Sequence, residues 1–431
     1  MRIIKRLHTL ERLEHRSLLA GDCTVTVSGG DLIIRGDALA NQIEIRQISA
    51  GNYEITGQDG TLINGAPSFL AKRVNDDFRI EMAQGGSDSV KLLGALRVPD
   101  RLDVVMGDGN LQILGTTGIV RVGGVVDIHR ASPDVFFELT IRDQVQFDRK
   151  VTLTGCESVF IESRGQLTGP TFNDPLVIMS CDFLQIESFD QSVGPRFKKS
   201  VTLGAGPPTD SFDVNIASNG DSIGPRFDGS VNMILGESIR IESNDTSTGP
   251  RFDGSVNLWA AVNVIVQSHH SSDGLQFRGP VTFHAADDVF ITSGDQSQGA
   301  TFYGKATFDA GVSVVVVSSD DSVGPVFKGN VGMTTDQDVL IWSRNNSVGP
   351  TFRQPVNITV AENRAPSIRA LPPTVACISA KRAEPVAPAT RWIDRFSPAV
   401  MYRGARKLGP AATLKIELMS TVVPALIRTV A

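Results

Sequence analysis

The sequence predicts an all-β fold, a right-handed parallel β-helix of about ten coils, and three repeating features lead to this prediction. A phenylalanine recurs every 25 residues, with one longer step of 30 residues between Phe197 and Phe227. Two aliphatic columns and a serine column keep the same period. The phenylalanines are Phe147, Phe172, Phe197, Phe227, Phe252, Phe277, Phe302, Phe327 and Phe352. The serines are Ser163, Ser188, Ser218, Ser243, Ser268, Ser293, Ser318 and Ser343.

One repeat unit, residues 227–250, has the pattern of two short strands joined by turns. Val231, Met233 and Leu235 alternate with other residues, and Ile239 and Ile241 do the same. A period of two is typical of strands, and the Gly, Ser, Asn and Asp between these runs are typical of turns. Because one unit is too small to bury its own apolar side chains, we expect the units to stack about 4.8 Å apart. The right hand follows the general preference of parallel β connections.

Two details favour a continuous stack over a row of separate domains. The five extra residues, 205–209, fall between the two strands of their coil, where they lengthen a turn without shifting the strands. The serine column follows an inward aliphatic column by two residues, so its hydroxyls should point inward at a corner. There they are expected to bond to each other or to the turn backbone, because a buried hydroxyl needs a partner.

The composition limits the class of protein. The chain has 431 residues, of which 41% are hydrophobic, and a net charge of −6. It is too long for one ordinary globular core, but growth by repeats avoids that limit. No run of eighteen apolar residues is present, so we expect no membrane-spanning helix. The negative charge argues against nucleic acid as a partner.

Residues 1–21 are predicted to be an export or targeting segment. They are basic and leucine-rich, and the stretch from Leu13 to Leu19 reads LEHRSLL. This stretch resembles the LEPR-XLL motif at the N-terminus of large secreted or surface proteins of planctomycete bacteria, and departs from it at His15, where the motif has proline. The resemblance implies export to the cell surface or outside, with removal near Ala20. The alternative is an amphipathic helix that caps the first coil.

Residues 22–97 are predicted to be a β-rich cap region, because alternating segments are joined by Gly, Asn and Asp turns without the 25-residue period. Residues 98–360 form the predicted β-helix. Residues 361–431 are a Pro- and Ala-rich linker and a basic tail with eleven Lys and Arg against four acidic residues. This tail is predicted to be partly helical or disordered. If the tail is ordered, we expect it to fold back on an apolar outward face. This face is made by Ile265, Phe290, Val315, Val317, Leu340 and Trp342.

Three sets of residues are weak candidates for chemistry. Glu162 and Glu187 occupy equivalent positions of adjacent coils, so we expect them about 5 Å apart, near the carboxylate spacing of a retaining glycosidase. No aromatic platform or cluster of Arg, Lys and His is evident beside them. Cys156 and Cys181 lie one period apart and could form a disulfide or remain a buried thiol pair. The turn aspartates could hold calcium, although Asp also simply favours turns. They are Asp190, Asp245, Asp295 and Asp320.

The function that this pattern favours is a non-enzymatic extracellular or cell-surface β-solenoid with a structural or adhesive role. Every coil offers nearly the same surface, whereas a catalytic site needs one coil to differ. Its expected partners are cell-envelope polysaccharide, other surface proteins or further copies of the chain. Two alternatives share the architecture: a polysaccharide-active enzyme, either a lyase or a glycosidase, and a calcium-stabilised adhesin. No cofactor other than possible calcium is expected.

Overall fold

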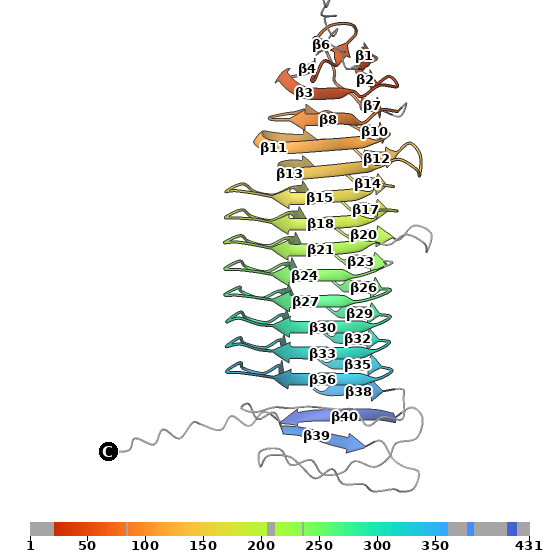
Figure 1. Ribbon diagram of the computed structural model, residues 1–431. Coiled ribbons are helices and arrows are strands. Elements are labelled where there is room, and N and C mark those ends of the chain that lie inside the picture. The colour runs from red at the N-terminus through yellow and green to blue at the C-terminus, as the bar shows by residue number, and fades with distance from the viewer. Residues whose placement is uncertain are drawn as a thin grey trace, which may run out of the picture.

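The computed structural model describes residues 21–82, 85–204, 212–234, 237–360, 377–382 and 412–419, and shows an all-β parallel solenoid of about eleven turns. Figure 1 shows the coils stacked along one axis, from β1 at one end to β38 at the other. The described residues contain strands and turns but no helix, and hence no helix that could cross a membrane. The predicted fold class is confirmed, with about one coil more than expected.

The first sheet contains one strand from each coil, and its strands pair in parallel from β2 to β38. Their inward residues alternate with outward ones, as period-two runs require. The strands are β2 (Asp31–Arg35), β7 (Phe78–Met82), β10 (Leu102–Met106), β12 (Val126–Arg130), β14 (Val151–Thr154), β17 (Leu176–Met179), β20 (Val201–Gly204), β23 (Val231–Ile234), β26 (Val256–Ala260), β29 (Val281–Ala285), β32 (Ala306–Ala310), β35 (Val331–Thr335) and β38 (Val356–Val360).

The second sheet forms the opposite side of the coils and is also parallel from β3 onward. Its strands are β3 (Gln42–Ser49), β8 (Asp88–Leu93), β11 (Gly109–Val122), β13 (Phe137–Phe147), β15 (Ser158–Ser163), β18 (Phe183–Ser188), β21 (Asp213–Ser218), β24 (Ile239–Ser243), β27 (Val264–Ser268), β30 (Asp288–Ser293), β33 (Ser313–Ser318) and β36 (Asp338–Ser343).

A row of two-residue strands closes each coil between the two sheets. It comprises β9 (Arg97–Val98), β16 (Thr171–Phe172), β19 (Arg196–Phe197), β22 (Arg226–Phe227), β25 (Arg251–Phe252), β28 (Gln276–Phe277), β31 (Thr301–Phe302), β34 (Val326–Phe327) and β37 (Thr351–Phe352). We call it the short row. The longer β11 and β13 extend into it, since Val122 pairs with Val98 and Phe147 with Phe172.

The phenylalanine column lies inside one continuous hydrophobic core, as predicted. Every member is buried, and consecutive rings are stacked with centroids 4.7 to 4.9 Å apart. The longer step between Phe197 and Phe227 leaves this register intact, because β20 and β21 on either side of the insertion still pair in line with their neighbours. The insertion itself falls mainly on residues 205–211, outside the described part of the chain.

The N-terminal region combines parallel coils with antiparallel hairpins. β1 (Asp22–Ser28) pairs antiparallel with β2, β4 (Asn52–Gly57) with β3, and β6 (Ser68–Lys72) with β4, while β5 (Leu62–Ile63) lies parallel to β1. The parallel pairing nevertheless begins at β2 and β3, so no break in the sheets marks residue 98. This region therefore ends the stack as irregular coils that share the same core.

Two strands of the tail lie beyond the last coil. β40 (Ala412–Met419) pairs antiparallel with β38, and β39 (Cys377–Arg382) pairs antiparallel with β40. Figure 1 shows both strands beneath β38. The rest of the tail, which is predicted to be partly helical or disordered, lies outside the described residues.

Candidate functional site

The corner after the second sheet is built from two serine columns, of which the sequence analysis identified one. The predicted column is buried, and a second column four residues further on lies against it. Ser192 Oγ lies 2.9 Å from Ser163 Oγ and donates to the Ser163 carbonyl at 3.1 Å, and Ser222 repeats this against Ser188. The second column is Ser192, Ser222, Ser247, Ser272, Ser297, Ser322 and Ser347. These serines stabilise the corner, and their period made them detectable in the sequence.

In the turn beyond this corner, the four predicted calcium candidates adopt the left-handed backbone conformation. The φ values of Asp190, Asp245, Asp295 and Asp320 lie between 54° and 59°. The other members of the column, Gly165, Gly220, His270 and Asn345, also have positive φ. Asp, Asn and Gly are the residue types that adopt this conformation most readily, so backbone geometry accounts for the column.

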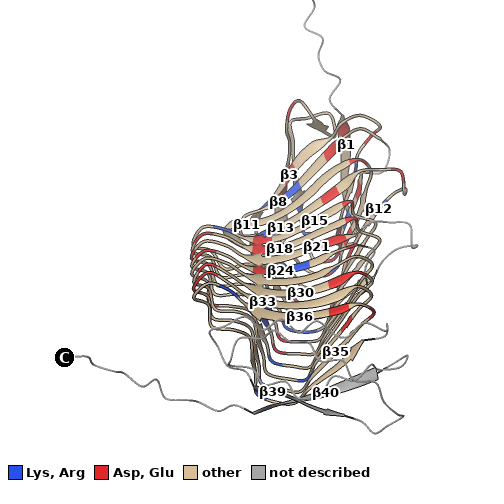
Figure 2. Ribbon diagram, turned by 60° about the horizontal axis from the view of Figure 1, so that its bottom comes forward, with Lys and Arg blue, Asp and Glu red and all other residues tan. Residues whose placement is uncertain are grey.

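The turn aspartates also bond between coils. Asp190 Oδ2 accepts from the Gly165 amide at 3.1 Å, and Asp245 Oδ2 accepts from the Gly220 amide at 3.0 Å. Figure 2 shows acidic residues stacked along this edge. In the described ranges the three acidic groups close enough to share one ion are Asp76, Asp77 and Asp100, near the start of the stack. The four turn aspartates therefore do not converge on a common point.

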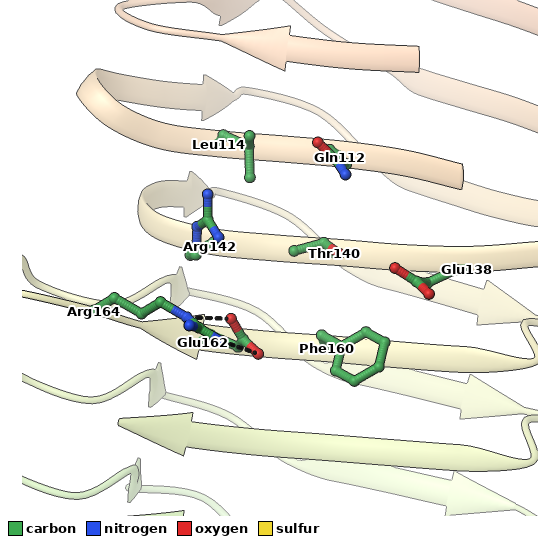
Figure 3. Close-up of a pocket in the computed structure, with 8 residues that line it drawn as sticks. All are labelled: Gln112, Leu114, Glu138, Thr140, Arg142, Phe160, Glu162 and Arg164. Carbon is green, nitrogen blue, oxygen red and sulfur yellow. Dashed lines mark hydrogen bonds and ion pairs between the residues drawn. The ribbon is translucent and has the colours of Figure 1, made fainter. Parts of the chain in front are cut away.

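Four charged outward side chains surround a hollow on the second sheet, over β11, β13 and β15. The hollow measures about 250 Å³ and opens to solvent. Figure 3 shows side chains of three consecutive coils around it. These residues are Gln112, Leu114, Glu138, Thr140, Arg142, Phe160, Glu162 and Arg164. Their positions follow from the alternation of the strands, which turns every second side chain outward.

The carboxylate of Glu162 is held by the arginine two residues later. Arg164 donates from Nε and Nη2 to the two carboxylate oxygens at 2.9 and 3.3 Å, as the dashed lines in Figure 3 show. Glu162 is only 5% exposed, whereas the Arg164 side chain is half exposed and packs over the Phe189 ring. A two-pronged contact of this kind fixes the carboxylate in orientation.

Glu187 lies directly beside Glu162 on the next coil, as predicted, but in a different environment. The two residues are partners in the parallel register of β15 and β18. Burial is the main cause that raises the pKa of Glu187, and the nearby carboxylates of Glu162 and Glu242 raise it further. Asn215 on the following coil donates to Glu187 Oε1 at 2.5 Å. The pair therefore combines one ion-paired carboxylate with one whose pKa is raised, mainly by burial.

Beside this pair, where no aromatic platform and no cluster of Arg, Lys and His was expected, the structure places one aromatic ring and two arginines. Phe160 lines the same hollow as Glu162, and its ring lies 5.9 Å from that of Phe183. Arg142 and Arg164 supply two cations. The signal for Phe160 was present in the sequence, because it occupies the outward column next to Glu162. Arg142 was overlooked because it precedes its register partner Glu162 by 20 residues instead of 25, and Arg164 because its column holds a second arginine only at Arg344.

The two repeat cysteines are buried and carry free thiols in this structure, with no disulfide between them. Burial raises the pKa of Cys181 to about 12 and raises that of Cys156 strongly as well. Cys181 Sγ donates to the Phe183 carbonyl at 3.2 Å. Of the two options in the sequence analysis, the geometry shown is that of a buried thiol pair, which is poorly reactive because the thiolate is disfavoured.

A polar cluster in the cap region was not predicted. Asp88, at the start of β8, is fully buried and accepts from the backbone and side-chain amides of Asn41 at 2.8 and 3.1 Å. Its other carboxylate oxygen has no partner among the described residues. Burial is the largest cause that raises the pKa of Asp88 to about 6. The cap lacks a repeat, so no column in the sequence pointed to these residues.

The predicted docking face for the tail is a continuous outward stripe. Ile265, Phe290, Val315 and Leu340 are register partners on β27, β30, β33 and β36, and they are half-buried. Val317 and Trp342 pair beside them. Of the described tail strands, β40 pairs with β38 and β39 pairs with β40, at the end of the stack and away from this stripe. The remaining tail residues lie outside the described part of the chain.

Comparison with protein-family models, with curated proteins and with solved structures finds no match for this chain.

Proposed function

We propose that this chain is a non-enzymatic extracellular or cell-surface β-solenoid with a structural or adhesive role. The resemblance of LEHRSLL to the LEPR-XLL motif supports export. The observation that carries the proposal is the repetition of outward polar groups from coil to coil. Asn257 donates to Asn232 on the preceding coil at 2.8 Å, and Gln166 donates to Gln191 on the next at 3.1 Å. A surface of this kind suits a partner whose own groups recur along a line.

Localisation is the first test. Cells that produce the full chain are treated with protease before lysis, and the chain is followed by immunoblot beside a cytosolic marker. We expect the chain to be cleaved while the marker stays intact. A matched variant that lacks residues 1–21 should remain inside and be protected. Protection of the full chain in intact cells would overturn the proposal.

Adhesion is tested separately with beads that carry the purified full chain. We expect these beads to be retained on cell-envelope preparations more strongly than beads that carry albumin. Equal retention of the two kinds of bead would refute an adhesive role.

A second candidate function, cleavage of polysaccharide, is favoured by one observation: Glu162 and Glu187 are register neighbours, of which one is ion-paired to Arg164 and the other has its pKa raised by burial. That division is typical of paired carboxylates in which one acts as nucleophile and the other as acid. Phe160 offers a ring on which a sugar could stack.

The test of this candidate is release of reducing ends from acidic glycans by the purified chain. Glu162→Gln and Glu187→Gln should each abolish release, while Glu54→Gln in the cap region should not. Absence of release from the unmodified chain would leave the adhesive role as the sole proposal.

A further inference from the structure

The residue that follows each phenylalanine of the short row forms an outward column with a marked change of charge along the solenoid. The column reads Asn173, Lys198, Asp228, Asp253, Arg278, Tyr303, Lys328 and Arg353. Its members stay in register, because the amides of Tyr303, Lys328 and Arg353 each donate to the phenylalanine carbonyl of the preceding coil at 2.8 Å. Equivalent atoms therefore recur about every 4.8 Å along the axis.

In the earlier coils the charges of this face neutralise one another. Asp228 pairs with Arg196 at 2.8 Å and with Arg226 at 2.5 Å. Asp253 continues the chain of ion pairs, with Arg226 at 3.1 Å and Arg251 at 2.8 Å. Arg278 closes the series at 3.5 Å from Asp253.

Beyond Arg278, which lies 3.5 Å from Asp253, the later coils have no such neutralisation on this face. The stretches 275–282, 300–307, 325–332 and 350–357 contain four cations and no acidic residue. Within the described residues no ion pair joins Lys305, Lys328 or Arg353 to a carboxylate. Tyr303 lies between the cations: Lys328 Nζ is 3.8 Å from its ring centroid and Arg278 Cζ is 5.9 Å from it. The ring thus positions cations that would otherwise be free to move.

The turn beside this column leaves it accessible. Gly279, Gly304 and Gly329 form a tight corner in which an added Cβ would lie only 2.2 to 2.6 Å from the glycine carbonyl oxygen of the preceding coil. Side chains cannot be accommodated there, so a bare backbone ridge lies next to the cations. On the other side, Thr301 and Thr351 present hydroxyl groups.

We propose that Arg278, Lys305, Lys328 and Arg353, with Tyr303 among them, bind a linear acidic polysaccharide that lies along the solenoid axis. Cations that recur on four consecutive coils, three of them in the column and Lys305 two residues beyond it, match a polymer whose carboxylates recur along an extended chain. Nucleic acid fits less well, because Lys328 already covers the Tyr303 ring on which a base would stack. The proposal deepens the adhesive function proposed above and rests on it for its biological setting.

The test is the affinity of the full purified chain for polygalacturonate, measured by calorimetry at low and high salt. Binding should weaken as salt rises, since exposed charges are screened. Methyl-esterified polygalacturonate, which lacks the carboxylates, and single-stranded DNA should both bind at least about 10-fold more weakly. Equal affinity for DNA or for the ester would overturn the proposal.

Variants separate this column from the basic stretch beyond residue 360. Lys328→Glu combined with Arg353→Glu should weaken binding by about 10-fold or more. Tyr303→Leu keeps every charge but removes the ring, and should weaken it by about 2- to 5-fold. Lys198→Glu, in the same column but on an earlier coil, is the matched control and should have little effect. All variants are checked for an unchanged melting curve. Undiminished binding by the double variant would refute the inference.

Failure of this inference and failure of the proposed function can be told apart. A chain that is exposed on cells but does not bind polygalacturonate keeps the surface role and loses the cationic column as a glycan site. A chain that binds polygalacturonate through this column but remains protected inside cells keeps the glycan site and loses the surface role.

Discussion

Truncating one phenylalanine in the middle of the core tests the stacked column most directly. Phe252 is fully buried, and its ring lies 4.7 Å from Phe227 and 4.9 Å from Phe277, nearly parallel to both. Truncation of a buried phenylalanine typically lowers the free energy of unfolding by about 3–5 kcal/mol. Each aromatic contact that is lost contributes about 0.5–1.5 kcal/mol to this decrease. We therefore expect Phe252→Ala to lower the free energy of unfolding by about 5 kcal/mol.

The end of the column provides a graded comparison. Phe352 is 9% exposed and has one stacked neighbour, Phe327, so Phe352→Ala should cost about 1–2 kcal/mol less than Phe252→Ala. Phe136 lies outside the column and is 53% exposed, and Phe136→Ala should change stability by less than about 0.5 kcal/mol.

The assay is guanidinium unfolding followed by circular dichroism, with the denaturant slope compared between variants because repeat arrays can unfold in parts. If Phe252→Ala and Phe136→Ala cost the same, the phenylalanines do not share one core. Equal losses at Phe252 and Phe352 would instead refute the contribution of the second stacked neighbour.

Three further predictions concern corners and the cap. Ser222→Ala removes a buried hydroxyl that bonds to the preceding coil, and should lower the free energy of unfolding by about 1–3 kcal/mol, against no change for the exposed Ser271→Ala. Gly254→Ala places a Cβ about 2.3 Å from a carbonyl oxygen and should lower the free energy of unfolding by about 1–3 kcal/mol. Gly332→Ala, with open space around the added Cβ, should leave stability unchanged. Equal effects of the two substitutions in thermal melts would contradict the close approach at Gly254. Because the folded state raises the pKa of Asp88 to about 6, the stabilisation from its proton is full below about pH 4 and lost as pH rises through 6. The stability of Asp88→Asn relative to the unmodified chain should thus increase by on the order of 2 kcal/mol between pH 4 and 7, and a pH-independent difference would disprove the shift.

The repeated part of the fold could be predicted because equivalent positions lie one above another. Phe252 and Ser243 could be placed inside from their columns alone, and the residues of the Asp245 column indicated a turn. The ion pair of Glu162 could not be predicted from the period, because the column of Arg164 holds a second arginine only at Arg344, several coils away. Periodicity identifies what every coil shares, whereas a local site depends on what one coil has alone.

The contacts of the cap region could not be predicted either, because its sequence has no repeat. Its hairpins and the buried contact between Asn41 and Asp88 arise from residues far apart in sequence that follow no period. Propensity predicted strands there but not their antiparallel partners, since pairing depends on how the whole region closes over the first coil. The tail strand β40 was missed for the same reason.

Strand pairing links each coil only to the coil before it and the coil after it, which has a consequence for how such a chain can change over generations. Two consecutive coils still carry the same nine residues, GPRFDGSVN, at 224–232 and 249–257. Duplication of one such unit extends the rod by about 4.8 Å. The existing coils keep their interior contacts, and the two ends of the stack are unchanged. Reach can therefore be adjusted by duplication or deletion in small steps, without redesign of the interior.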